Sequence, residues 1–253
     1  MGQRIMVRDF QVSGSFNGSS TNVTLPTTPS TTNFNIAFWV KLNARTSNAR
    51  VFDWQDGGPL NGFEVLQSSD LTRGQFILSN GSGQVAVLSA TPPTGKWVHF
   101  VGTYEVDNVK WYMNSVLVDT DTSATMTAAA ATPTIGKRAT ASSNFSNMNM
   151  DEFILHNAAP WTQAQVTELY AKGTIPSGVD VIYNFNNQVL DQSGNGNDGT
   201  DTSLTYSFNV VSKPRFLIRN FVSCLDFDGV DDVVLASAIQ VSGNYTITAW
   251  IRP

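Results

Sequence analysis

The C-terminal part of the chain repeats its N-terminal part at an offset of 211 residues. The tripeptide FNG at 16–18 returns as FDG at 227–229, and the segment NFNIAFWV at 33–40 returns as NYTITAWI at 244–251. A repeat at a fixed offset indicates that one structural unit recurs along a chain. The sequence therefore predicts one full unit followed by the opening part of a second.

Charge and cysteine content exclude several classes of protein. Only 14% of the 253 residues are charged and the net charge is −5, whereas nucleic-acid binding needs clustered Lys and Arg. Cys224 is the single cysteine, so no intrachain disulfide is possible, and its apolar neighbours predict a buried thiol. No apolar run approaches membrane-spanning length, so we expect neither nucleic-acid binding nor membrane insertion.

The first residues, MGQRIMVRD, lack the apolar segment of a secretory signal peptide, so we expect no secretory signal in this chain. Phage and viral structural proteins reach their destination without one, because host lysis releases them. We therefore expect an extracellular or virion-surface location.

Short alternating segments separated by Gly, Asn, Asp and Pro dominate the chain, and this pattern is typical of a β-sandwich or barrel. Turns are predicted at 107–108 and 114–115. The segments expected to form strands are 35–42, 62–67, 75–79, 84–88, 96–105 and 109–119.

One segment departs from this pattern and predicts a short helix after Pro160. Thr162 is the expected N-cap, with Gln165 three residues later, and Gly173 is the expected C-terminal stop. Val166, Leu169 and Tyr170 are expected to face the sandwich.

Several of these segments resemble motifs of laminin G-like domains of the concanavalin A-like lectin/glucanase superfamily. The segment MDEFILHN at 150–157, with the helix after it, resembles the closing strand and helix of that family. Other matches are WVHFVGTY at 97–104, WYMNSVLV at 111–118, DQSGNGNDG at 191–199 and LDFDGVDD at 225–232. The resemblance implies an all-β, concanavalin A-like jelly-roll β-sandwich with one short C-terminal helix.

The family's opening motif, at 191–199, follows the closing helix instead of preceding the first strands. The favoured interpretation is a laminin G-like sandwich at 1–176 and the truncated opening part of a second unit at 177–253. Alternatively, residues 1 to about 219 form a circular permutant and the duplicated tail is surplus. In that case the strands of residues 177–253 are shared with the first domain, or residues 220–253 pair with a neighbouring subunit in self-assembly.

No catalytic motif is found, so we predict that the protein is not an enzyme. The fold also hosts glycoside hydrolases, whose glucanase signature places carboxylates at Glu-x-Asp-x-x-Glu on one strand. The nearest match, residues 105–110, has Lys110 at the third position and turn chemistry at Asp107. His99 lies where the family commonly has a histidine inside a strand, which implies a structural role.

Calcium is the cofactor that the resemblance implies, because laminin G-like domains often hold this ion at their rim through loop oxygens. The positions that correspond are Asp151, Asn17 and, in the second copy, Asp228. Asn17 replaces the usual Asp and so removes a charge.

Glycan binding is expected to need an exposed aromatic side chain. A Gly-rich turn would present Trp54 outward, beside Asp56, whereas packing in the core is the alternative for this tryptophan. The other strand tryptophans are expected in the core and Trp161 against the helix. The polar loops 120–134 and 139–149 are typical of ligand-contacting segments.

These observations favour a non-catalytic structural or recognition protein. We predict a laminin G-like module of an extracellular or virion assembly, of decoration or fibre type, that binds glycans or a surface protein. The alternative is a secreted tandem-domain, carbohydrate-binding adhesin, and a glycoside hydrolase is a distant third.

Overall fold

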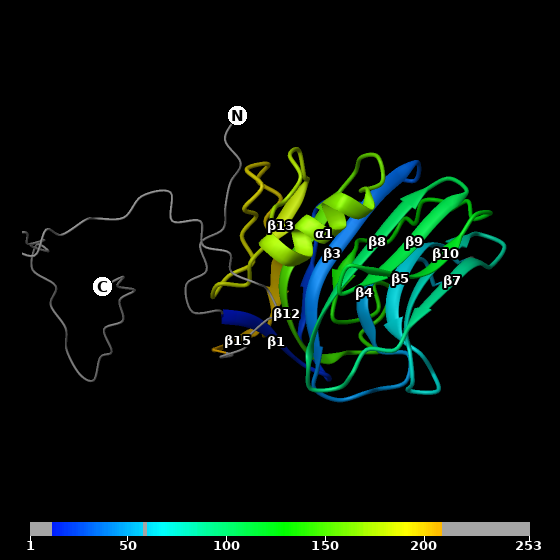
Figure 1. Cartoon of the computed structure of the whole chain (residues 1–253). Helices are drawn as coiled ribbons and strands as arrows, with labels where there is room; N and C mark the ends of the chain where they lie inside the picture. Colours follow the sequence, from blue (N-terminus) through cyan, green and yellow to red (C-terminus); the bar gives the residue numbers. More distant parts are fainter. Residues whose placement is uncertain (1–11, 58–59, 209–253) are drawn as a thin grey trace, which may run out of the picture. The chain divides into compact units, whose positions relative to one another are not determined.

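The computed structural model describes residues 12–57 and 60–208, which form fifteen strands and one helix (Figure 1). The strands are β1 (Val12–Asn17), β2 (Asn22–Thr24), β3 (Asn33–Leu42), β4 (Arg50–Gln55), β5 (Asn61–Gln67), β6 (Gly74–Asn80), β7 (Gln84–Ala90), β8 (Trp97–Glu105), β9 (Asn108–Met113), β10 (Val116–Asp121), β11 (Thr134–Ile135), β12 (Asn147–His156), β13 (Val181–Tyr183), β14 (Thr200–Thr202) and β15 (Thr205–Phe208). The helix is α1 (Gln163–Lys172).

Two antiparallel sheets form a sandwich and confirm the predicted fold class. The eight-stranded sheet has the order β10-β9-β8-β3-β12-β1-β15, with β13 paired to β12 as well. The seven-stranded sheet has the order β14-β2-β11-β4-β5-β6-β7. Consecutive side chains of a strand point to opposite faces, so a strand can bury one face between the sheets. The strands β10 and β14 are exceptions, because neither contains a buried residue.

Aromatic side chains fill much of that space. Phe34 stacks on Phe63 with ring centroids 4.5 Å apart, which joins β3 of one sheet to β5 of the other. Phe100 stacks on Trp111 at 4.7 Å within the eight-stranded sheet. Burial of such rings supplies most of the hydrophobic stabilisation of a sandwich.

The predicted turns are confirmed by the backbone. Asp107 lies between β8 and β9 at φ 59°, and Asn114 and Ser115 join β9 to β10 at φ 51° and 67°. Asn and Asp tolerate this left-handed region better than other residues with side chains, which explains their presence at the turns.

Helix α1 covers the outer face of the eight-stranded sheet (Figure 1). Thr162 and Gln165 form the predicted capping box, and Gly173 ends the helix in the left-handed conformation at φ 72°. Val166 and Leu169 are buried, and Tyr170 stacks on Trp39 at 5.6 Å, as predicted. His99 is buried beside the same tryptophan, with its ring centroid 5.0 Å away.

The segment that follows α1 contributes strands to both sheets. β13 pairs with β12 and β15 pairs with β1 in the eight-stranded sheet, and β14 pairs with β2 in the seven-stranded sheet. Residues 181–208 therefore lie in the same sandwich as residues 12–156. The duplicated tail, with Cys224 and Asp228, lies outside the described residues.

Candidate functional site

One outward-facing row crosses the seven-stranded sheet, and it contains two carboxylates. The register aligns one residue from each strand: Thr200, Thr24, Thr134, Asp53, Glu64, Ile77 and Val87. The next row, which includes Phe52 and Phe76, faces the core. Because side chains alternate along a strand, Asp53 and Glu64 project from the opposite, outer face.

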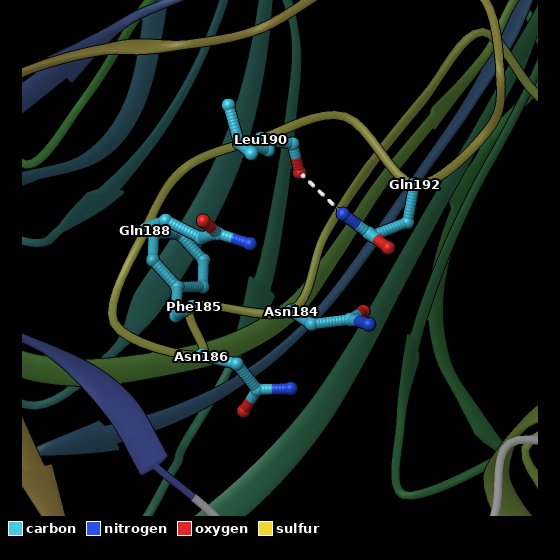
Figure 2. A pocket seen from close by; sticks show the side chains of 6 residues that line it. All are labelled: Asn184, Phe185, Asn186, Gln188, Leu190 and Gln192. Carbon is cyan, nitrogen blue, oxygen red and sulfur yellow. Dashed lines mark hydrogen bonds between the residues drawn. The ribbon is translucent and has the colours of Figure 1, made fainter.

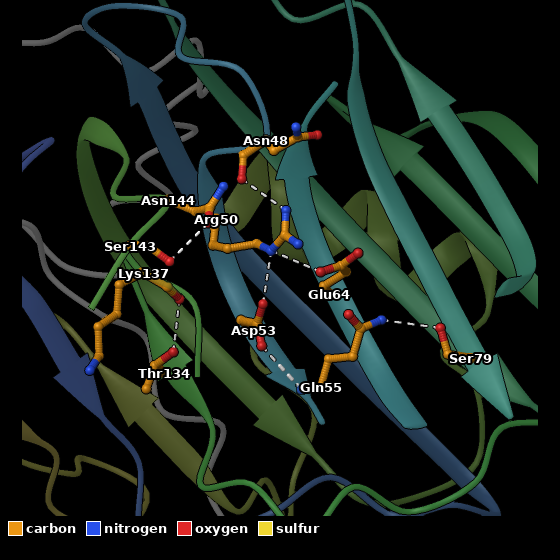
Figure 3. A network of polar contacts seen from close by, with 10 residues as sticks. All are labelled: Asn48, Arg50, Asp53, Gln55, Glu64, Ser79, Thr134, Lys137, Ser143 and Asn144. Carbon is orange, nitrogen blue, oxygen red and sulfur yellow. Dashed lines mark hydrogen bonds and ion pairs between the residues drawn. The ribbon is translucent and has the colours of Figure 1, made fainter. Parts of the chain in front are cut away.

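Arg50 joins these two carboxylates. A register shift in the pairing of β4 with β5 occurs between Arg50 and Phe52. The guanidinium Nε then lies 2.9 Å from Asp53 Oδ2 and 2.8 Å from Glu64 Oε2 (Figure 3). Nη1 donates a hydrogen bond of 2.8 Å to the carbonyl of Asn48. One cation thus contacts two anions, and all three side chains are at least nine-tenths buried.

The loop of residues 137–146 is bound to this charge network. The backbone N–H of Arg50 donates to the carbonyl of Asn144 at 2.8 Å. The backbone of Ala139 hydrogen-bonds to Asp53, and the charge of Arg138 acts on Glu64. Thr140 is exposed at the outer part of the loop. The carboxylates therefore hold the base of a loop whose tip faces solvent.

Burial sets the protonation of the network. The pKa of Glu64 is raised to about 7, because burial and the neighbouring Asp53 carboxylate together outweigh the opposing charge of Arg50. Burial also raises the pKa of Asp53, although Arg50 and the N–H groups of Ala139 and Gln55 oppose the shift. A buried charge is unfavourable unless it is paired, and here two acids share one guanidinium group.

Trp54 does not occupy the exposed position that its Gly-rich turn suggested. It is 2% exposed and packs edge-on against Phe63 in the core, with ring centroids 6.3 Å apart. The expectation of outward presentation is wrong, because Trp54 belongs to β4 and alternation points it between the sheets. Its ring offers no face on which a sugar could stack.

Asp56 lies just after β4 and anchors a loop. Its carboxylate accepts hydrogen bonds of 3.0 Å from the backbone N–H groups of Ala130 and Ala131, and one of 3.1 Å from Asn61. Burial disfavours the charged form, but these three donors outweigh it and lower the pKa of Asp56. The carboxylate therefore holds part of the 120–134 loop against the sheet.

The two described positions implied for calcium lie apart. Asn17 pairs with Asn147 of β12, whereas Asp151 lies four residues further along that strand, roughly 13 Å away at the usual rise. Asn17 Oδ1 accepts N–H groups from Ser19, Ser20 and Thr21 at 2.9, 2.9 and 3.2 Å. These two positions do not fit a shared site.

The described part of the chain also brings no three His, Cys, Asp or Glu side chains together as a metal site. Asp151 is buried, and its Oδ1 accepts a 2.8 Å hydrogen bond from the N–H of Glu152. Asp228 lies outside the described residues.

A small hollow lies in the loop after β13 (Figure 2). Its lining consists mainly of side-chain amides, from Asn184, Asn186, Gln188 and Gln192, with Phe185 and Leu190. The space is about 60 Å³, which is too small for a sugar ring. The hollow therefore does not form a glycan site in this conformation.

The charge network was missed in the sequence, although a signal for it is present. Asp53 stands between Phe52 and Trp54, and Glu64 stands between Phe63 and Val65. An acid flanked by large apolar residues in each of two neighbouring strands indicates a charge on the outer face of a buried sheet. Only the register shows that Arg50 reaches both acids.

Comparison with known families gives a match that covers more than half of the chain. The sequence profile of the concanavalin A-like lectin/glucanases superfamily, in its laminin G form, matches residues 17–167. The chain belongs to this superfamily. No curated protein matches the chain in sequence.

Solved structures of low sequence identity share the superfamily fold. A proposed carbohydrate-binding protein from Bacteroides ovatus is 12% identical with a TM-score of 0.62, over 81% of this chain and 61% of that one. The present chain thus spans less than two thirds of the Bacteroides protein. The heptameric SAP-like pentraxin from Limulus polyphemus is 15% identical with a TM-score of 0.57, over 81% of this chain and 98% of that one.

Membership of the lectin/glucanase superfamily establishes the fold. It does not establish an activity, because activity depends on the residues of the individual site. In the described part of the chain, no helix has the length and apolar character needed to cross a membrane.

Proposed function

We propose that the chain is a non-catalytic carbohydrate-binding module that contacts glycans through the polar 137–146 loop above the seven-stranded sheet. The observation that supports this proposal is the pairing of Asp53 and Glu64 with Arg50 beneath that loop. The network fixes the base of the loop and leaves Thr140 and Ser142 exposed. Loops held on a rigid scaffold commonly carry binding residues.

The same network argues against hydrolysis. Glycosidases need one carboxyl group as acid and a second as base or nucleophile, both facing the glycosidic bond. Here both carboxylates contact a single guanidinium nitrogen, and their side chains are 1% and 3% exposed. An acid held in an ion pair under a loop has no access to a sugar.

The structurally similar protein from Bacteroides ovatus is a proposed carbohydrate-binding protein, and it supports the proposal at the level of the fold. The experiment is a glycan array probed with the full chain, followed by calorimetry on the strongest hit. We expect Thr140→Ala combined with Ser142→Ala to weaken binding by about two- to tenfold, the loss from roughly one net hydrogen bond to a ligand. The matched control is Thr167→Ala, which lies on α1 against the other sheet.

Two results would contradict the proposal. Binding that Thr140→Ala and Ser142→Ala leave unchanged would remove the 137–146 loop as the contact surface. Release of reducing sugar from a bound oligosaccharide would show that the module is catalytic after all.

Self-assembly is the second candidate function, and the edge strand β10 favours it. Val116, Leu117 and Val118 are 62%, 44% and 36% exposed on this strand, whose outer edge has no strand partner in the sheet order of the described residues. An exposed apolar edge is a template for adding a strand. We propose the duplicated tail of a second copy, residues 220–253, as the added segment, in an extracellular or virion-surface assembly.

Light scattering on the full chain tests self-assembly. The proposal requires oligomers that Leu117→Lys disrupts and that Lys172→Ala, on the exposed side of α1, leaves intact. Monomers at all concentrations would rule it out.

Calcium binding also stays a proposal, for Asp151, Asn17 or Asp228 acting separately. Thermal unfolding with and without a chelator tests it. An unfolding temperature that the chelator does not change would remove calcium as a structural cofactor.

A further inference from the structure

His156, the last residue of β12, is buried and meets the chain on both sides of helix α1. Its Nδ1 accepts a 3.0 Å hydrogen bond from the indole Nε1 of Trp161, which lies immediately before the N-cap of the helix. A Cβ added to Gly178, in the segment after the helix, would lie 4.0 Å from Nε2 of the same ring. One imidazole ring therefore faces the segments that enter and leave α1.

Trp161 anchors the start of α1 on the sheet. It is buried in one apolar cluster with Val166 and Leu169 of the helix and Ile154 of β12. Trp161 directly precedes the N-cap Thr162, and Val166 is the fourth residue of the helix, which is the hydrophobic-staple arrangement that fixes how a chain enters a helix. Movement of Trp161 would therefore loosen the first turn of α1.

Two polar side chains hold Trp161, and one of them is titratable. Asn35 Oδ1 accepts a 2.8 Å hydrogen bond from the backbone N–H of Trp161, and Asn35 Nδ2 donates to the carbonyls of Ala158 and Ala159 at 3.2 and 3.1 Å. The amide of Asn35 does not change its charge with pH. The imidazole of His156 does, because an unperturbed histidine changes its charge between pH 5 and 8.

The hydrogen bond between Trp161 and His156 requires the neutral imidazole. An indole N–H can only donate, so Nδ1 of His156 must present a lone pair, and the proton of the neutral ring lies on Nε2. Protonation of Nδ1 removes the acceptor and turns two N–H groups toward each other. A buried donor that loses its partner is unfavourable, so protonation of His156 destabilises the position of Trp161.

The groups around His156 favour its neutral form. Burial lowers the pKa of His156, whereas the charge of Asp180, before β13, opposes this shift. Asp180 Oδ2 itself accepts a 2.6 Å hydrogen bond from the backbone N–H of Asn157. Asn35, which meets His156 from β3, and Trp161 are uncharged. The stability that His156 contributes is therefore complete above its ordinary pKa of 6.5 and is lost as pH falls through the lowered value.

We infer that His156 is a pH-sensitive latch for helix α1. In its neutral form it holds the start of the helix on the eight-stranded sheet through Trp161, and in its protonated form it releases that end. Release exposes the outer face of the sheet beneath the helix, where Val101 and Tyr112 are buried in the same apolar cluster as Trp161.

Hydrogen exchange on the full chain at pH 7.5 and pH 5, corrected for the intrinsic exchange rate at each pH, tests the latch. We expect protection of the amides of residues 166–172 to fall about two- to tenfold at pH 5, the loss from roughly one net hydrogen bond, while β4 to β6 keep theirs. Glu64 acts with the opposite sign, since its raised pKa makes its contribution to stability grow as pH falls. A fall in helix protection therefore does not come from Glu64.

His156→Asn is the deciding variant, because the Asn oxygen can replace Nδ1 as the acceptor and does not titrate. It should keep helix protection at pH 7.5 and lose most of the fall at pH 5. The matched control is His99→Asn, which changes the second histidine of the chain, beside Tyr170, and should leave the fall in place. A fall that is absent from the unchanged chain, persists in His156→Asn or disappears in His99→Asn overturns the inference.

A second measurement decides the outcome if His156→Asn does not fold. Trp161→Phe removes the indole N–H and keeps an aromatic ring. NMR titration of the His156 ring should then give a higher pKa than in the unchanged chain, because Nδ1 no longer accepts a hydrogen bond that requires the neutral form. An equal or lower pKa in Trp161→Phe overturns the inference.

Discussion

At the scale of single residues, Glu64 makes stability depend on pH. Burial raises the pKa of Glu64 to about 7 from an ordinary value of 4.5. The protonated form is therefore favoured in the folded state, and the stability that it contributes is complete below about pH 4.5 and is lost as pH rises through 7. We expect Glu64→Gln to stabilise the fold by roughly 1–3 kcal/mol at pH 8 and by much less at pH 5. Urea unfolding at both pH values measures this, with the exposed Glu168→Gln as control. An equal effect at the two pH values would contradict the raised pKa.

Loss of Arg50 should destabilise the fold, whereas loss of the Glu64 charge should stabilise it. Among the described residues, Arg50 is the only cation in direct contact with either buried acid. Arg50→Met removes the charge and keeps much of the side-chain volume. Two buried carboxylates are then left unpaired, and we expect a loss of about 3–5 kcal/mol at pH 8, as is typical of a broken buried pair. Protonation of the acids should reduce the loss at pH 4. Arg73→Met, at an exposed pair with Asp70, is the control and should cost less than about 1 kcal/mol.

The site was only partly predictable, because residue types alone do not specify strand alternation or register. The glycines after Trp54 left an outward and a core position open in the sequence, but its strand continues to Gln55 and the alternation along that strand points Trp54 into the core. Asp53 could have been predicted, because an acid between Phe52 and Trp54 indicates a carboxylate on the outer face of the sheet. Arg50 carries no such signal, since its reach depends on a register shift that no local sequence pattern specifies.

At the scale of elements, helix α1 offers a direct test of local sequence logic. Gln165 N–H donates to Thr162 Oγ1 at 3.3 Å, and Thr162 N–H donates to Gln165 Oε1 at 2.9 Å. Thr162→Ala breaks this capping box and should destabilise the fold by about 1 kcal/mol. Thr167→Ala, within the helix, is the comparison and should change stability by less than half as much. Equal losses in urea unfolding would show that the cap contributes nothing specific.

Elements whose determinants are local were predicted well. The capping box, the Gly173 stop and the turns at Asp107 and Asn114 depend on residues within a few positions of each other. The edge of β12 that β1 and β13 share depends on contacts that are not local, because β1 pairs with β12 through residues more than a hundred positions apart and Tyr183 of β13 pairs with Phe153, 30 positions away. Gly14 is a constraint of this kind too, because a Cβ added there would lie 2.7 Å from the Phe185 ring.

At the scale of the whole molecule, family motifs predicted the fold and left the order of its parts open. Residues 17–167 match the superfamily, whereas the strands β14 and β15 lie beyond that match and still pair with β2 and β1. A motif that opens a domain in other proteins therefore does not by itself mark a boundary here. The contacts of the segment decide where it belongs.

That argument leads to a prediction about two shortened chains, one ending at Gly178 and one ending at Phe208. The first lacks Val181, Tyr183, Phe185 and Val189, which are buried in the core. Each such side chain contributes about 1.5–3 kcal/mol, so together they approach the 5–15 kcal/mol net stability of a typical domain. We expect the chain ending at Phe208 to unfold cooperatively in calorimetry and the chain ending at Gly178 to show no cooperative transition. If both unfold at the same temperature, residues 179–208 add nothing to the sandwich, and its boundary lies at the linker after α1.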